Sequence, residues 1–353
     1  MTRYANRSRR GAVTDRTRRN RNCASGVRKR RRLRHHPTML ERDMTRRGFL
    51  GGASMLGLAG CAIGHAAAEE AHPPVGRFVT AEGLSIHHTD EGDGPPIVLI
   101  HGASGNLRDM TFSLSGRMVA QGFRVIAFDR PGHGYSDRPA ERGWDPAVQA
   151  RVLRAALAEI GVERAVIAGH SWGGAVATAW ALQSPESAAA VASLAGATHP
   201  WGGDAGFLYS VGANPWLSPL ARTAARLMVD EDDPTDVLNR IFAPDAIPDG
   251  YADYVGVSLA LRPDTFRWNC EDLDNLNACV GELAPRYPSL TMPVLAMHGT
   301  ADDTVAASIH AEQLVKDAPD ARLALLDGVG HMPHHAAEDV VVARLSELAR
   351  AAA

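Results

Sequence analysis

The chain has 353 residues, of which 45% are hydrophobic, enough for one large domain with an inserted subdomain and a buried core. The net charge of -3 hides an uneven distribution. Residues 1–43 hold 15 basic and three acidic residues, and the remaining 310 residues hold 22 basic and 37 acidic ones. A strongly acidic body is a poor candidate for binding nucleic acid.

Residues 1–43 form a basic head with almost no large apolar side chains, and we expect this head to be disordered. Basic runs of this kind can bind nucleic acid or an anionic membrane, but the segment that follows argues against such a role. We interpret the head as lying upstream of the true start of translation, at Met39 or Met44.

Residues 44–68 are predicted to be an export signal. The pair Arg46-Arg47 precedes a Gly/Ala-rich apolar stretch that is too short and weak for a stable membrane span, as in a twin-arginine signal. Two processing routes stay open: cleavage near Ala68, or lipidation of Cys61 in the lipoprotein-like box "LAGC". Either predicts an exported bacterial protein, periplasmic or anchored on the outer side of the inner membrane.

Two of the four cysteines, Cys270 and Cys279, lie in the mature body, within a segment that is predicted to be helical. A spacing of nine residues places them on opposite faces of a helix, about 13 Å apart, which is too far for a disulfide. We therefore expect both thiols to be free.

The body alternates short apolar runs with amphipathic segments, which predicts a mostly parallel sheet covered by helices. After a hairpin at 76–92, the predicted strands are 95–102, 123–129, 164–169, 188–196, 293–299 and 321–328, with helices at 145–161 and 306–319. Residues 198–288 hold many aromatic side chains but no clear buried strand, and are too long for a loop, so we expect a helical lid. The sheet domain is thereby divided into 69–197 and 289–353.

Polar, glycine-rich motifs follow five of the predicted strands, where a parallel sheet places its reactive site. The motifs are "HGASGN" (101–106), "DRPGHGYS" (129–136), "GHSWGG" (169–174), "HGTADDTV" (298–305) and "GVGHMPHH" (328–335). With its motifs in this order, the chain resembles the α/β-hydrolase superfamily over residues 76–349, closest to the lidded serine esterase-like branch with a G-H-S-x-G-G motif. The resemblance implies the α/β-hydrolase fold.

The resemblance also implies a catalytic triad of Ser171, Asp302 and His331. A serine hydroxyl needs a base to become nucleophilic, and in this fold the residues come in the order serine, acid, histidine. Asp303 is expected to cap the following helix, and His334 and His335 to line the entrance or begin the last helix. The expected oxyanion hole consists of the backbone N–H groups of Ala103 and Trp172.

Ser104 and Trp201 are the residues that we expect to contact substrate, although Ser104 also fits a simple turn residue. Asp129 and His133 are expected to hold their own turn together, and His101 and His170 to shape the floor of the site. No metal-ligand cluster and no dinucleotide-binding motif stands out, so no metal and no cofactor are predicted.

The sequence therefore predicts a serine hydrolase that cleaves a carboxylic ester of a small to medium apolar molecule through an acyl-enzyme. The same triad could instead cleave a carbon–carbon bond or an amide, or carry out perhydrolysis. A further alternative is an exported binding protein that has lost turnover. The expected partner is a small-molecule ester and no nucleic acid; membrane anchoring follows only from the route in which Cys61 is lipidated, and the oligomeric state stays open.

Overall fold

The computed structural model describes residues 66–203, 206–228 and 234–353, which all belong to one compact unit, Ser54–Ala353. The basic head at 1–43, most of the predicted export signal and the thiol of Cys61 lie outside the described residues. The predictions made for these segments therefore stay predictions.

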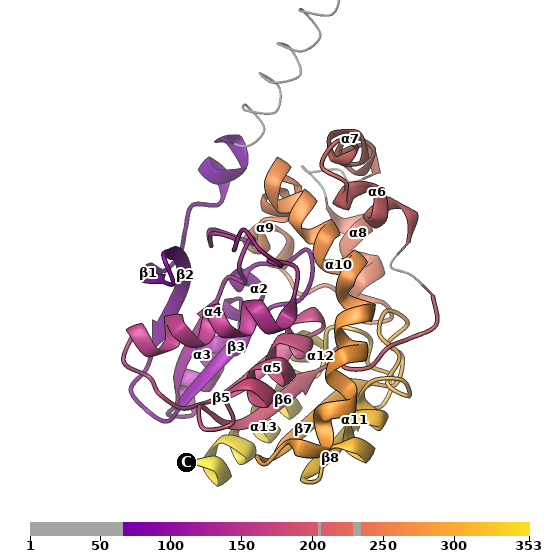
Figure 1. Ribbon diagram of the computed structural model, residues 1–353. Helices are drawn as coiled ribbons and strands as arrows, with labels where there is room; N and C mark the ends of the chain where they lie inside the picture. Colours follow the sequence, from indigo (N-terminus) through magenta and orange to yellow (C-terminus); the bar gives the residue numbers. More distant parts are fainter. Residues whose placement is uncertain (1–65, 204–205, 229–233) are drawn as a thin grey trace, which may run out of the picture. The chain divides into compact units, whose positions relative to one another are not determined.

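An eight-stranded, mostly parallel sheet forms the centre of the described chain, as the sequence predicted (Figure 1). The strand order is β1-β2-β4-β3-β5-β6-β7-β8, and only β2 runs opposite to the other strands, antiparallel to both β1 and β4. The strands are β1 (Arg77–Ala81), β2 (Leu84–Glu91), β3 (Pro96–Ile100), β4 (Arg124–Phe128), β5 (Ala165–His170), β6 (Ala188–Leu194), β7 (Val294–Gly299) and β8 (Ala321–Leu326).

Two apolar clusters, one on each face, bury the central strands under helices. The helices of the sheet domain are α2 (Leu107–Thr111), α3 (Leu114–Ala120), α4 (Pro146–Glu159), α5 (Trp172–Gln183), α11 (Ala311–Asp317), α12 (Pro333–Ala336) and α13 (Glu338–Ala352). Along β5 every residue is buried, because the strand is covered on both faces.

A helical insertion separates β6 from β7, where the sequence predicted a lid. Its described elements are α6 (Phe207–Ala213), α7 (Ser218–Met228), α8 (Thr235–Phe242), α9 (Tyr251–Val255), the 3₁₀-helix η1 (Val257–Leu261), α10 (Pro263–Leu283) and the 3₁₀-helix η2 (Ala284–Ser289). Cys270 and Cys279 are both free and buried in α10, as expected.

The helix predicted at 306–319 is shorter than expected, since α11 begins only at Ala311. Asp303 does not cap it, because the N-cap position is occupied by His310, so that prediction was wrong. The N-cap prediction failed because 300–310 forms turns in which Asp302, not Asp303, accepts the backbone N–H groups of Thr304 and Val305.

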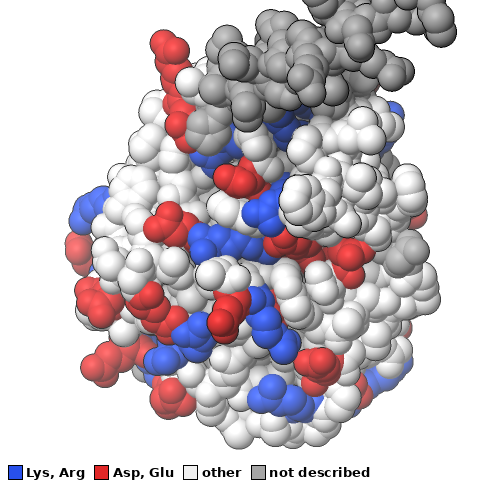
Figure 2. Space-filling model, turned by 45° about the horizontal axis from the view of Figure 1, so that its top comes forward, with Lys and Arg blue, Asp and Glu red and all other residues white. Residues whose placement is uncertain are grey.

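Acidic and basic side chains are interspersed over the face shown in Figure 2, without a large area of one sign. Among the described residues, none of the helices combines the length and apolarity needed to cross a bilayer.

The turn between β5 and α5 allows no side chain at several positions. A Cβ atom on Gly169 would lie 2.0 Å from the carbonyl oxygen of Gly173, and one on Gly173 would lie 2.4 Å from that of Ile100. Strand and helix therefore approach so closely that only glycine fits at these positions.

We predict that Gly169→Ala lowers the free energy of unfolding by about 2–4 kcal/mol, because the added methyl group displaces backbone rather than a flexible side chain. Gly281→Ala in α10 is the matched control, since its nearest contact would be 3.9 Å away, and it should be neutral or stabilising by up to about 1 kcal/mol. Urea denaturation measures both, and equal stabilities would contradict the prediction.

Candidate active site

Ser171 lies on the turn between β5 and α5 with a backbone φ of 52° and ψ of −117°. A positive φ is unfavourable for a residue with a side chain and persists only where the surroundings enforce it. Here the backbone N–H of Ser171 donates to Leu194 and its carbonyl accepts from Ala197, so β6 and the loop after it hold the turn. The strain places the hydroxyl at the carboxyl edge of the sheet.

His331 lies between Ser171 and Asp302 and contacts both. Its Nε2 is 3.0 Å from the Ser171 Oγ, and its Nδ1 is 2.8 Å from the Asp302 Oδ2. Because a carboxylate can only accept, Nδ1 carries the proton and Nε2 is free to accept from the serine hydroxyl. The three residues that the sequence singled out from distant segments thus form one continuous hydrogen-bonded chain.

Asp302 is held in its charged form. Burial by itself would raise its pKa, but hydrogen bonds from His298 and His331 outweigh burial and leave the pKa well below the ordinary value. The other carboxylate oxygen accepts the backbone N–H groups of Thr304 and Val305 at 2.9 and 2.8 Å. A fixed, ionised carboxylate stabilises positive charge on His331 when the imidazole takes up a proton.

Ala103 follows β3 and Trp172 is the first residue of α5, so the two predicted oxyanion donors come from different loops at the same edge of the sheet. The N–H of Trp172 has no acceptor within its own helix because it belongs to the first turn. Arg130 connects the two loops: its guanidinium donates to the carbonyl of Gly102 and lies 4.1 Å from the centre of the Trp172 ring system.

Arg130 belongs to a buried ion network that the sequence did not predict. Arg130 and Arg138 lie 2.8 and 2.9 Å from the two oxygens of Asp272, and both Arg130 and Asp272 have fully buried side chains. The Trp172 indole donates to the backbone carbonyl of Asp272 at 3.2 Å. Because Asp272 belongs to α10, the network joins the helical insertion to the turn that carries Ser171.

The two residues predicted to contact substrate both have partners in the insertion. Asn269 accepts the N–H of Ser104 at 2.6 Å and donates to its hydroxyl at 2.9 Å. Asn277 bonds the backbone N–H and carbonyl of Trp201, each at 3.0 Å. Ser104 and Trp201 are thereby fixed in position by α10, and contact with substrate stays a prediction for both.

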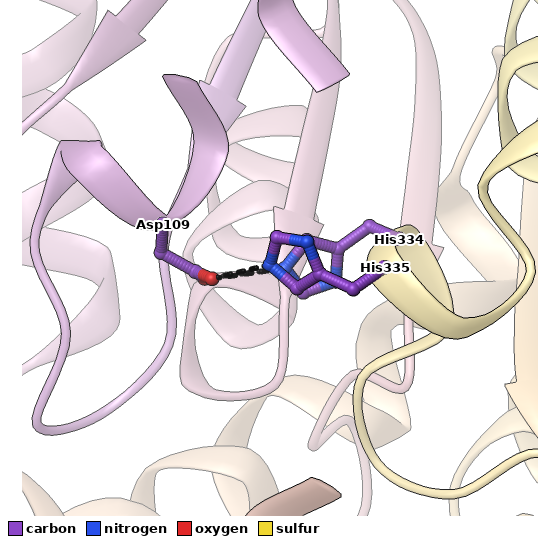
Figure 3. Close-up of side chains that lie close together, drawn as sticks. All are labelled: Asp109, His334 and His335. Carbon is purple, nitrogen blue, oxygen red and sulfur yellow. Dashed lines mark hydrogen bonds and ion pairs between the residues drawn. The ribbon is translucent and has the colours of Figure 1, made fainter. Parts of the chain in front are cut away.

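Asp109, His334 and His335 form a second polar cluster beside the triad (Figure 3). Asp109 lies on α2 and both histidines lie on α12, which begins two residues after His331. The Nε2 atoms of His335 and His334 are 2.9 and 3.2 Å from the Asp109 Oδ1, and the hydroxyl of Tyr251 donates to the same oxygen at 2.8 Å. The expectation that the two histidines line an entrance or begin the last helix was wrong, because both lie on the short α12, ahead of α13, and face the buried carboxylate of Asp109.

The side chains of this Asp109 cluster are of the types that bind metal ions, with one ligand atom from each residue and all three atoms within 4.8 Å of one another. Asp109 already accepts hydrogen bonds from two imidazoles and a phenol, which satisfies the carboxylate without a cation. Burial opposes its ionisation, yet the two histidines hold its pKa well below the ordinary value.

His170 connects the Asp109 cluster to His331. Its Nε2 donates to the backbone carbonyl of His331 at 2.9 Å, and its ring lies 4.4 Å from that of His334, centre to centre. Burial, together with the nearby His334 and His331, lowers the pKa of His170 well below the ordinary value, so the ring is neutral. The backbone of His331 is therefore fixed on one side by His170 and on the other by α12.

The motif "DRPGHGYS" holds its own turn together, as expected for Asp129. The carboxylate of Asp129 accepts the backbone N–H groups of Leu107 and Tyr135 at 2.7 and 2.8 Å. His133 packs against Arg130 at 3.0 Å, and the Nε2 of His101 accepts the backbone N–H of Arg130 at 3.0 Å.

Comparison with known proteins identifies the family to which the fold belongs. Residues 95–337 match the family described as "alpha/beta hydrolase fold". An uncharacterised protein of Mycobacterium tuberculosis is 30% identical over 281 residues, covering 74% of this chain and 77% of the relative. A 2-hydroxymuconate semialdehyde hydrolase of Pseudomonas putida is 34% identical over 119 residues, 34% of this chain and 42% of that enzyme.

Among solved structures, an esterase from Exiguobacterium antarcticum superposes with a TM-score of 0.63 at 21% identity, covering 78% of this chain and all of the esterase. With the family match and the sheet order, these similarities define the class: the chain belongs to the α/β-hydrolase fold family and is a hydrolase of that fold.

The pKa of Asp109 gives a prediction for stability against pH. Because its folded pKa lies below the unfolded value of about 4, the charged form stabilises the protein above that pH, and this stabilisation is lost as the pH falls below about 4. Asp109→Asn should therefore cost about 2 kcal/mol of unfolding free energy at pH 7 and progressively less below pH 4.

Urea denaturation between pH 7 and pH 3 measures the difference. Asp249→Asn, at an exposed position of the helical insertion, is the control and should change little at any pH. A difference for Asp109→Asn that stays constant over this range would show that the charge of Asp109 does not stabilise the fold.

Proposed function

We propose that the protein is a serine hydrolase that cleaves carboxylic esters through an acyl-enzyme. The observation that carries this proposal is the hydrogen-bonded chain Ser171–His331–Asp302, with heavy-atom distances of 3.0 and 2.8 Å. These distances lie within the range needed for proton transfer from a nucleophile to a base. The strained conformation of Ser171 gives further support, since strain of this kind clusters at reactive residues.

In the proposed reaction, the Ser171 Oγ attacks the ester carbonyl while His331 takes its proton at Nε2. The N–H groups of Ala103 and Trp172 stabilise the resulting oxyanion, each by about 3 kcal/mol. His331 then gives the proton to the departing alcohol, and the acyl group stays on Ser171. A water molecule, deprotonated by His331, releases the carboxylic acid and restores the serine.

The proposed substrate is a small to medium apolar ester. The aromatic and aliphatic side chains of the helical insertion support an apolar acyl or aryl group, because such groups bind in apolar pockets. Ser104 and Trp201, each fixed by an asparagine of α10, are the residues that we expect to contact it.

A second candidate function is hydrolysis of a carbon–carbon bond on the same triad. It is favoured by the similarity to a 2-hydroxymuconate semialdehyde hydrolase over 119 residues. Parallel assays with p-nitrophenyl esters of two to eight carbons and with a ring-cleavage semialdehyde separate the two functions. Turnover of the semialdehyde at least about tenfold above that of every ester would favour the second.

We further propose that the chain is exported and that Cys61 carries a lipid. The support is the sequence of residues 44–68 alone: a paired arginine, a short apolar stretch and the box "LAGC". Mass spectrometry of the protein isolated from bacterial membranes should find a diacylglyceryl Cys61 as the first residue. A first residue near Glu69 would instead show a cleaved, unlipidated protein.

We predict that a fluorophosphonate probe labels the protein and that both Ser171→Ala and His331→Ala abolish labelling. The first change removes the attacking oxygen, and the second removes the base that activates it. Asp302→Asn should lower ester turnover by at least about a thousandfold, because His331 loses the carboxylate that fixes its tautomer.

Circular dichroism of each variant provides the folding control. Arg142→Gln, which removes the exposed partner of an ion pair with Asp145, is the matched control and should label like the unmodified chain. A folded protein that does not label, or a Ser171→Ala variant that still labels, would refute the proposed nucleophile.

A further inference from the structure

Large apolar side chains are exposed on one pair of helices of the insertion. Twelve such side chains are exposed among the described residues, and six of them lie within 207–228, on and between α6 and α7. These six side chains form what we call the α6–α7 apolar face: Phe207, Trp216, Leu217, Leu220, Leu227 and Met228. Trp216 is 89% exposed. Single exposed apolar residues are normal on a protein surface, but a group of six on and between two neighbouring helices is not.

Helix α7 is amphipathic and points its apolar side outward. Leu220, Leu227 and Met228 share one side, since residues seven or eight apart lie on the same side of a helix, and all three are exposed. The inward side consists of Ser218, Ala221, Arg222 and Ala225, and Arg222 donates to the carbonyl of Leu261. An ordinary surface helix has the opposite orientation, with its apolar side against the core. The α6–α7 apolar face therefore has the properties of a contact surface.

The chemistry of this face suits the interface of a membrane. Residues 206–228 contain two arginines and no Asp or Glu, so insertion would dehydrate no carboxylate in this segment. Tryptophan is enriched at the boundary between headgroups and acyl chains, and an amphipathic helix lying in that plane buries its apolar side.

The position of the face also fits a membrane. Glu69, eight residues after Cys61, pairs with Arg262 at 2.8 Å, and the neighbouring Leu261 is the residue that accepts the bond from Arg222 of α7. The start of the described chain and α7 thus contact two neighbouring residues, Arg262 and Leu261. Figure 1 shows both segments at the same end of the molecule. A lipid anchor on Cys61, as proposed above, would hold this end close to a bilayer.

We propose that the α6–α7 apolar face binds the surface of a phospholipid bilayer. Leu220, Leu227 and Trp216 enter the interface, while Arg222 stays on the inward side of α7 against the carbonyl of Leu261. Four acidic residues follow α7 in the sequence, at 230–233, so the contact depends on apolar burial rather than on net positive charge. Binding should therefore be only weakly sensitive to salt.

The test uses the full chain and phosphatidylcholine vesicles in a sedimentation assay. The double variant Leu220→Gln/Leu227→Gln should lower the partition coefficient at least about tenfold. The matched control is Leu323→Gln/Leu325→Gln on β8, which removes two exposed leucines from another surface and should bind like the unmodified chain. The apolar stretch before residue 66 is the same in all variants, so differences among them report the α6–α7 apolar face.

A second measurement follows Trp216 directly. Vesicles should shift the fluorescence of the unmodified chain to shorter wavelength, and Trp216→Phe should remove most of that shift. Equal partition of both double variants, with no contribution of Trp216 to the shift, would overturn the proposal. The alternative is that a second copy of the chain covers this face, and light scattering tests it. If the unmodified chain is a dimer, and Leu220→Gln/Leu227→Gln makes it a monomer without loss of vesicle binding, the second copy is the occupant.

Circular dichroism without lipid shows that each variant is folded, and fluorophosphonate labelling of the same samples reports the proposed serine chemistry separately. Failure of the proposed serine chemistry would abolish labelling in all chains and leave the vesicle result intact. The two proposals are therefore tested separately.

Discussion

The close approach of β5 and α5 around Ser171 is the constraint on which the rest of the site depends. The turn forms only because Gly169 and Gly173 lack a Cβ atom, for which the surrounding backbone leaves no room. It holds Ser171 at a φ of 52°. This conformation is unfavourable by itself, and the hydrogen bonds and burial of the surrounding parallel strands offset its free-energy cost. The position of the hydroxyl is therefore set by the core of the sheet and not by the loop alone.

The buried ions around Arg130 extend this constraint to the helical insertion. Two guanidinium groups share the carboxylate of Asp272, and removal of any one partner would leave an unpaired charge in the interior. The same Arg130 contacts the loop of Ala103 and the ring of Trp172. Movement of α10 is thus coupled to the geometry of both proposed oxyanion donors, and the insertion is part of the site rather than a cover laid over it.

Histidine has two different uses in this protein. His331 faces a hydroxyl on one side and a charged carboxylate on the other, the arrangement that proton transfer needs. His170, His334 and His335 form hydrogen bonds that fix the backbone around His331. The same residue type is the proposed general base at position 331 and forms structural hydrogen bonds three and four residues later.

The sequence determined the alternation of strands and helices, the glycine-rich turn at Ser171 and the order of the polar motifs, because these depend on local periodicity and on residues close along the chain. The three residues Ser171, Asp302 and His331 could be selected in advance, since a parallel sheet places the ends of its strands at one edge. Only the tertiary structure decided the partners of Asp109, Asn269 and Asp272, which lie more than 100 residues from the groups they contact. Such pairs carry no local pattern, and they become visible only when packing removes water and each buried polar group needs a partner.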